Sequence, residues 1–152
     1  GQGVAGTTLQ SLQVLATVAN KGEQMTPYLV SRILDPDLNE VSSTSTKVAR
    51  TPIDSATASS LSSLMQTAVA EGTGTSAQVS GVQVAGKTGT AETGTDSGPT
   101  TWFVGFAGTD IDKPEIALAV VLDGNAETED GAPGGKVAGP VAAQVIDAAV
   151  NQ

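Results

Sequence analysis

The sequence contains no cysteine and no histidine. These absences exclude a Cys nucleophile, a His general base and the side chains that most often bind zinc. Any catalysis within this chain must therefore use Lys, Ser, Thr or carboxylate side chains. The lack of Cys fits a bacterial cell-envelope protein without disulfides, and it fits a cytosolic protein equally well, so it does not decide the compartment.

Basic residues and long apolar runs are also scarce. Seven Lys and Arg stand against 16 Asp and Glu, the net charge is −9, and the basic residues form no cluster. Because binding to nucleic acid requires a basic surface that neutralises phosphates, we exclude DNA and RNA as partners. Apolar runs such as Ile116–Leu122 are too short to cross a bilayer, and no signal segment opens the chain. We therefore expect any membrane anchor to lie outside this sequence.

The chain has enough apolar content for a core, with 152 residues of which 39% are hydrophobic. Apolar residues at helical spacing predict three helices, at about 7–19 after a capping box, from Thr51 to Gly72, and from Gly135 to about Val150 with Pro140 near its first turn. The residues expected to face the core are Leu61, Leu64, Met65, Ala68 and Val69 in the second helix and Val141, Val145, Ile146 and Ala149 in the third.

Strand-like segments fall between these helices. Pro27–Leu34 predicts a strand that turns at residues 35–37 into a weaker partner, forming a small hairpin. Three further strands are predicted at Val82–Ala91, Thr101–Ala107 and Glu115–Leu122. The links between them are too short or too Gly-rich for parallel crossovers, so they should form an antiparallel meander, with exposed loops at 93–100 and 124–136. The predicted fold is one α+β unit, an antiparallel sheet with packed helices.

Two glycine patterns raise nucleotide binding as an alternative. Gly81–Thr88 fits the phosphate-loop pattern, and Ile116–Asp123 imitates the metal-binding strand of such proteins. A phosphate loop, however, needs its Lys and Thr at the start of a helix, whereas the residues before Lys87 alternate as in a strand. The opening Gly1–Gly6, with Glu23 downstream, matches a dinucleotide fingerprint but follows no strand, so a Gly-rich turn is the favoured interpretation.

Metal binding is not predicted. The acidic residues Asp123, Glu127, Glu129 and Asp130 suggest a calcium cluster, but they lack the ligand spacing and mid-loop glycine of an EF-hand. A solvated acidic loop is the simpler explanation. We therefore predict neither a metal nor a cofactor.

The segment Lys87-Thr88-Gly89-Thr90 has a physical use on a strand at the edge of a cleft, where alternate side chains share a side. Lys87 supplies positive charge, and the two threonine hydroxyls suit a substrate carboxylate. Gly89 allows a peptide to approach, and the Thr90 amide suits a developing oxyanion. The alternative is a plain surface strand. Glycines at 86 and 89 count against it, because glycine weakens a strand unless close approach is required.

The segment Gly86–Glu92 resembles the third motif of penicillin-recognising serine enzymes. Its surroundings resemble class B penicillin-binding proteins in particular, and the Thr-rich, acidic loops resemble those of actinobacterial cell-wall transpeptidases. The resemblance covers nearly the whole chain in order. Its other motifs are Gly1-Gln2-Gly3 before a helix, Val69–Gly74, Trp102–Ala107, Gly134-Gly135, and Ala138–Val141 at the start of the last helix.

The resemblance implies a peptidoglycan D,D-transpeptidase, in which a serine attacks the D-Ala-D-Ala stem peptide and a neighbouring amine accepts the acyl group. It implies catalytic roles for Lys87 and Thr90, and substrate binding by Thr88, Gly89, Thr90 and Ala91. The implied partners are peptidoglycan stem peptides, β-lactam antibiotics and the upstream part of the same domain. The implied location is the extracytoplasmic face of a bacterial membrane. Of the neighbours Trp102 and Phe103, one should lie in the core and the other at the cleft rim.

The motif that carries the nucleophile in this family is absent from the sequence. No lysine has a serine three residues before it, and no Ser-x-Asn motif occurs. We therefore expect residues 1–152 to be the C-terminal part of a transpeptidase domain, with the nucleophile upstream of Gly1, and to be inactive alone. Two alternatives stay open. A β-lactamase or β-lactam sensor of the same fold would differ in deacylation rate, and a non-catalytic binding module would lack Ser-x-x-Lys upstream.

Overall fold

The computed structural model describes residues 5–92, 98–123 and 134–151. Its centre is a three-stranded antiparallel sheet in the order β5-β6-β7, formed by β5 (Gln83–Ala91), β6 (Thr100–Gly108) and β7 (Ile116–Leu122). The predicted meander and the α+β class are confirmed. Lys87 lies inside β5 and pairs across to β6, so it does not begin a helix. The phosphate-loop alternative is therefore wrong.

Helix α1 (Thr8–Ala19) begins and ends where the sequence predicts. The Thr7 hydroxyl accepts a hydrogen bond from the Gln10 amide at 3.2 Å, and the Gln10 side chain accepts from the Thr7 amide at 2.8 Å. This reciprocal pair is a capping box, which satisfies two backbone donors that the helix leaves free. After Asn20, Lys21 and Gly22 take positive φ angles and turn the chain. A Cβ at Gly22 would overlap the carbonyl of Ile53, so only glycine fits this turn.

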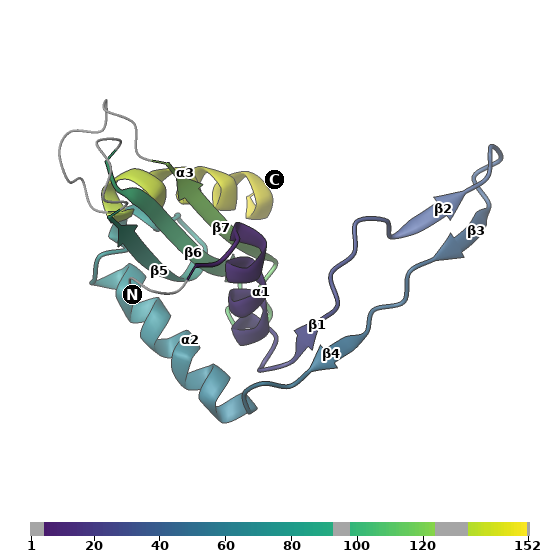
Figure 1. Cartoon of the computed structure of the whole chain (residues 1–152), viewed down its shortest axis with the longest axis horizontal. Coiled ribbons are helices and arrows are strands. Elements are labelled where there is room, and N and C mark those ends of the chain that lie inside the picture. The colour runs from purple at the N-terminus through teal and green to yellow at the C-terminus, as the bar shows by residue number, and fades with distance from the viewer. Residues whose placement is uncertain (1–4, 93–97, 124–133, 152) are drawn as a thin grey trace.

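Residues 24–50 form a two-stranded ribbon, here called the arm, which projects from the body (Figure 1). At its base β1 (Gln24–Met25) pairs with β4 (Val48–Arg50), and further out β2 (Arg32–Leu34) pairs with β3 (Glu40–Ser43). The hairpin and its turn are confirmed, since the Asp35 carboxylate accepts from the Asp37 and Asn39 amides. The strand predicted from Pro27 is wrong over residues 27–31. Only Arg32–Leu34 is strand, in part because proline cannot donate to a ladder.

Two further helices complete the body, α2 (Ser55–Ala70) and α3 (Gly134–Val150), with a short 3₁₀ turn at Thr75–Ala77. Asp54 caps α2 by accepting from the Thr57 amide at 2.7 Å. None of the described helices is long and apolar enough to cross a membrane.

The sheet lies between two helical layers, with α1 against one face and α3 against the other (Figure 1). The core on the α3 face centres on Phe103 and Ile146, and the core on the α1 face centres on Phe106 and Val18. Helix α2 lies next to β5 and contributes to both, through Val69 on the α3 side and Met65 on the α1 side. Strand β5 is thus in contact with α2, α3 and its neighbour β6, whereas α1 packs mainly on β6 and β7.

The predicted inward faces of α2 and α3 need correction. Val69 and Ile146 are buried, and Met65 and Ala68 are partly buried, but five predicted core residues are exposed: Leu61, Leu64, Val141, Val145 and Ala149. The reason is that α3 packs through small residues, which let its backbone approach the sheet and the 3₁₀ turn closely. A Cβ at Gly139, for example, would overlap the Ser76 hydroxyl. The buried residues of α3 are Gly134, Gly135, Ala138, Gly139, Ala142 and Ile146.

Candidate active site

The candidate residues occupy the second half of β5, the outer strand of the sheet. Lys87 pairs with Val104, and Gly89 pairs with Trp102; the intervening Thr88 pairs with Phe103. Because cross-strand partners lie on the same face, Lys87 and Gly89 belong to the α1 face, while the two threonines of the motif belong to the α3 face. The predicted alternation of side chains along the strand is confirmed. It places the Lys87 ammonium on one face of β5 and the hydroxyls of Thr88 and Thr90 on the other.

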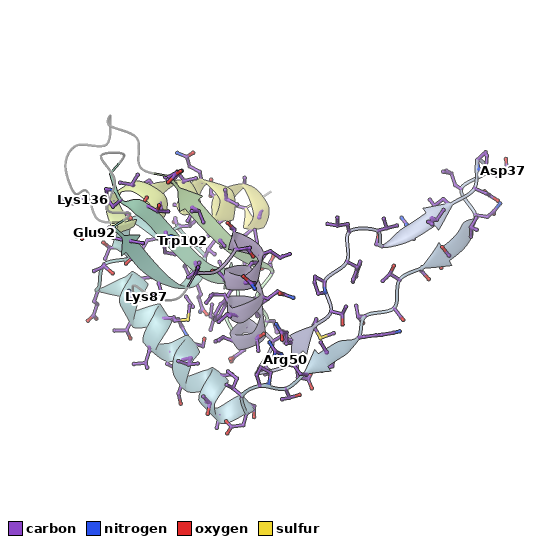
Figure 2. The ribbon with its side chains drawn as sticks, in the orientation of Figure 1. Asp37, Arg50, Lys87, Glu92, Trp102 and Lys136 are labelled. Atoms are coloured by element: carbon purple, nitrogen blue, oxygen red, sulfur yellow. The ribbon has the colours of Figure 1, made fainter. Side chains whose placement is uncertain are left out.

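On the α1 face, Lys87 borders a recess of about 280 Å³. Lys87 is exposed, and its Nζ donates to the carbonyl of Thr88 at 2.7 Å. Figure 2 labels Lys87 and Trp102, which lie on neighbouring strands of the sheet. Trp102 is half-buried at the rim of this recess, whereas Phe103 is fully buried, as the sequence predicts for two neighbours on a strand. The other residues that line the recess are Ser11, Val14 and Leu15 from α1, Thr88 and Gly89 from β5, and Val104 from β6. No carboxylate lines the recess among the described residues, so Lys87 is its charged group.

On the α3 face, each threonine of the motif has its own partner. The hydroxyl of Thr88 lies 2.7 Å from the hydroxyl of Thr73, which follows the end of α2. The hydroxyl of Thr90 accepts from the Gly134 amide at 2.9 Å, at the start of α3. A Cβ at Gly135 would overlap the Thr73 carbonyl, so the contact of α3 with this loop requires glycine. The loop at Thr73 therefore holds the Thr88 hydroxyl, and the start of α3 holds the Thr90 hydroxyl, both on the α3 face of β5.

Thr73 was not predicted as a site residue. It lies within the Val69–Gly74 segment that carries part of the resemblance, but nothing in the residue itself marks it. The usable signal is the pair of glycines that flank it. A Cβ at Gly72 would lie 2.8 Å from the Ala68 carbonyl, and one at Gly74 would lie 3.1 Å from the same atom. The two glycines thus let the loop fold back on α2 and present Thr73 to β5.

The two glycines around Lys87 have different roles. A Cβ at Gly86 would lie 2.9 Å from Cε2 of Phe103 and closer still to Cζ, so this glycine makes room for a core ring. A Cβ at Gly89 would have Trp102 Cβ as its nearest neighbour, at 3.3 Å. Gly86 is therefore required by the fold itself and is wrongly taken as evidence for a ligand-binding strand. A role of Gly89 in the approach of a ligand stays a prediction.

Beside Thr90 lies a further threonine that sequence analysis did not select. Thr101 is the cross-strand partner of Thr90, is 4% exposed, and its hydroxyl has no hydrogen-bond partner in the described part of the chain. Ala91, a predicted substrate-binding residue, ends β5 opposite Thr100 and is exposed. The end of β5 thus carries the exposed Thr90 and Ala91, with the buried hydroxyl of Thr101 beside them.

Of the acidic residues considered as calcium ligands, only Asp123 belongs to the described residues, and it contacts Thr100 near the end of β5. Gly1–Gly3 and the acidic residues Glu127, Glu129 and Asp130 lie outside the described residues. Asp123 accepts a hydrogen bond from the Thr100 hydroxyl at 3.2 Å. Within the part of the chain that is described, no three acidic side chains gather in a way that suits a metal ion.

The arrangement defines the chemistry that this edge supports. A ligand lying along β5 would have an ammonium group on one side and threonine hydroxyls on the other, with a glycine between them. Ammonium and hydroxyl groups are the donors that suit an anionic ligand, through charge and hydrogen bonds.

Comparison with known proteins identifies the family. Residues 1–147 match the family described as "Penicillin binding protein transpeptidase domain". The chain is 38% identical over 152 residues to the peptidoglycan D,D-transpeptidase PbpA of Mycolicibacterium smegmatis, covering 98% of this chain and 30% of that protein. It is 31% identical over 152 residues to the stage V sporulation protein D of Bacillus subtilis, covering 96% of this chain and 23% of that protein. The chain thus spans less than a third of the length of these relatives.

Solved structures give the same result. The crystal structure of PBPA from Mycobacterium tuberculosis superposes with a TM-score of 0.83 at 36% identity, covering 98% of this chain and 33% of that one. A ceftriaxone acyl-enzyme complex of penicillin-binding protein A from the same organism has a TM-score of 0.85 at 37% identity, with the same coverage of 98% and 33%. The arrangement of helices and sheet is therefore that of these proteins.

Proposed function

The chain belongs to the penicillin-binding protein transpeptidase domain family, and from this premise we propose that the complete protein is a class B peptidoglycan D,D-transpeptidase. Residues 1–152 would supply one wall of its active site, and the serine would come from outside this chain. The observation that carries the proposal is the Lys87–Thr90 strand, with its cation and its hydroxyls on opposite faces of an outer strand. The named activities of the relatives support it.

The proposed reaction has two steps. The serine hydroxyl attacks the carbonyl of the penultimate D-Ala of a stem peptide, an ester forms, and the amide bond to the terminal D-Ala breaks. The departing amine takes up a proton, and D-alanine leaves. An amine of a neighbouring stem then attacks the ester, the bond to the serine oxygen breaks as the crosslink forms, and the proton that the amine loses passes to that oxygen. β-Lactams would acylate the same serine, as the acyl-enzyme complexes of similar proteins suggest.

Within this scheme the described residues bind and polarise. Thr88 and Thr90 hold the terminal carboxylate, and Lys87 adds positive charge and assists proton transfer through the missing serine motif. Gly89 and Ala91 let the peptide lie against β5. The Thr90 amide donates to the oxyanion that develops on the attacked carbonyl. All of these assignments are parts of the proposal.

The partners and the location follow from the substrate. Stem peptides and β-lactams are the proposed ligands, and the upstream part of the same domain is the proposed neighbour on the recess side of Lys87. Because peptidoglycan is assembled outside the cytoplasmic membrane, we place the complete protein at the extracytoplasmic face, held by a segment beyond this chain.

Acylation kinetics test the proposal. In the complete protein, Thr90→Val keeps the β-branched shape and deletes one hydroxyl. A hydrogen bond to a charged carboxylate contributes about 1.5–3 kcal/mol, so the second-order constant for acylation by a penicillin should fall roughly tenfold to a hundredfold. Lys87→Ala should cost at least as much, because it removes a charge and a donor. Stopped-flow acylation and thermal unfolding of each variant give the answer.

Thr46→Val is a suitable control, because Thr46 is an exposed threonine on the arm. It should acylate at the parent rate. If Thr90→Val also acylated at the parent rate while its melting temperature fell by several degrees, Thr90 would be a packing residue. The isolated 152-residue chain should show no penicillin adduct by intact mass, and a stable adduct would place a nucleophile within it.

A further inference from the structure

Thr73 contacts Thr88, one of the two proposed carboxylate-binding residues, without belonging to its strand. Its hydroxyl is 2.7 Å from that of Thr88, and its carbonyl lies against Gly135 at the start of α3. A Cβ built on Gly135 would be 3.5 Å from the methyl of Thr88, so that methyl also lies close to α3. The side chain of Thr88 is thus held on two sides, by Thr73 and by α3.

The hydrogen-bonding capacity of the three hydroxyls decides what they can offer a ligand. Each threonine hydroxyl has one proton to donate and two lone pairs. The Thr90 hydroxyl accepts from the Gly134 amide, so its own proton remains to be donated. The Thr73 and Thr88 hydroxyls share one hydrogen bond, in which either is the donor. One proton of that pair lies between the two oxygens, and the other points away.

A bound carboxylate would favour one of the two possible directions of the hydrogen bond between Thr73 and Thr88. If Thr73 donates to Thr88, the Thr88 proton is directed outward and can bind the anion beside that of Thr90. A chain in which one hydroxyl donates to the next also strengthens the terminal donor, since each bond polarises its neighbour. If the Thr73 hydroxyl is removed, the Thr88 hydroxyl no longer accepts a hydrogen bond from it, and the contact that fixes the Thr88 rotamer is lost.

We propose that Thr73 is a positioning residue of the active site, which orients the Thr88 hydroxyl as a donor to the substrate carboxylate. The inference rests on the proposed function, because it presupposes that Thr88 and Thr90 bind that carboxylate. It adds a residue from the loop after α2 to the determinants of carboxylate recognition. Its effect should appear only with ligands that carry the anion.

The experiment compares a penicillin with its methyl ester in the complete protein, so that the carboxylate is present in one probe and neutralised in the other. Thr73→Val removes the hydroxyl and keeps the shape. The acylation constant for the free acid should fall about three- to tenfold, the size expected for one lost hydrogen bond. For the methyl ester it should fall less than about twofold on the same reasoning. Thr73→Ser, which keeps the hydroxyl, should stay near the parent for both.

A double variant tests whether Thr73 acts through Thr88. Thr73→Val made on top of Thr88→Val should cause no further loss with the free acid, because Thr73 acts through the Thr88 hydroxyl. Equal loss with both probes would show a general structural role and overturn the proposal. If Thr73→Val lowers the melting temperature by several degrees, Thr73→Ala replaces it and must show the same preference for the free acid.

The two proposals fail in distinguishable ways. If Thr88→Val and Thr90→Val slow acylation but Thr73→Val does not, the role of Thr73 is wrong and the proposed function stands. If neither Thr88→Val nor Thr90→Val matters for the free acid, the assignment of the carboxylate site is wrong, and the role of Thr73 is overturned with it.

Discussion

Replacement of each glycine of β5 by alanine should separate a glycine required by the fold from one required by the ligand. At Gly86 the new methyl would meet the ring of Phe103, at 2.9 and 3.1 Å from its Cε atoms and closer to Cζ. Phe103 is fully buried among Val84, Ile146 and other core residues, so the ring has no free space to enter. Overpacking of this kind costs about 1–3 kcal/mol.

At Gly89 the situation differs. The methyl would lie 3.3 Å from Trp102 Cβ, a contact that a shift of a few tenths of an ångström relieves, and Trp102 is only half-buried. We therefore expect Gly86→Ala to lower the melting temperature of the complete protein by roughly 2–12 °C, at about 2–4 °C per kcal/mol. Gly89→Ala should lower it by less than about 2 °C on the same scale and slow penicillin acylation at least about tenfold.

The assay is thermal unfolding followed by stopped-flow acylation on the same preparations. Phe103→Leu supplies the internal control, because a smaller side chain makes room for the methyl at Gly86. The double variant should therefore melt higher than the sum of the two single effects predicts, by an interaction of at least about 1 kcal/mol. If Gly86→Ala melted like the parent yet lost acylation, or if the two changes were additive, the reasoning about Phe103 would be refuted.

Two further predictions concern stability. Thr101→Val should raise the melting temperature or leave it unchanged, because the buried Thr101 hydroxyl has no hydrogen-bond partner among the described residues. Thr17→Val should lower the free energy of unfolding by about 1 kcal/mol, because that equally buried hydroxyl donates to the Gln13 carbonyl at 2.7 Å. A fall in melting temperature for Thr101→Val as large as that for Thr17→Val, in differential scanning fluorimetry, would contradict this. The backbone amide of Thr57 holds the pKa of Asp54 below its ordinary value of 3.8, so Asp54 stabilises the fold above that pH and its contribution disappears as the pH falls through the lowered pKa. Asp54→Asn, which keeps a capping oxygen but cannot titrate, should weaken the dependence of melting temperature on pH below about 4. If the melting temperature of this variant fell with acid as steeply as that of the parent, Asp54 would not be a source of the pH dependence.

The sequence predicts the elements well where the signal is local. The capping box at Thr7 and Gln10 fixes the start of α1, and the short connections between the last three strands leave only an antiparallel meander. It predicts burial poorly on α2 and α3. Periodicity selected large residues such as Leu64 and Val145, but α3 approaches the sheet through glycine and alanine, which hydrophobicity alone does not favour.

The candidate site was predictable as a strand but not as a three-dimensional contact. Lys87, Thr88 and Thr90 follow from motif and alternation, and the structure places them on opposite faces of β5 as a strand requires. Thr73 and Gly134 contact these threonines from positions 15 and 44 residues away in the chain. No local pattern reports such a contact, because it depends on how α2 and α3 pack. The sequence likewise does not show that the ring of Phe103 requires a glycine at 86 but not at 89, because this difference also depends on tertiary packing.

The arm has a consequence for how this domain tolerates change. Its two strands leave and re-enter the body side by side, since Met25 pairs with Val48 at the base. Everything beyond that pair can therefore be lengthened, shortened or replaced by a tight turn without moving α1 or α2, and the entropic cost of a longer loop grows only slowly. A short Asn-Gly turn joining Met25 to Val48 would make a trimmed version of the domain. The arm is thus the place where this chain can accept an inserted tag or reporter while the edge of β5 stays intact.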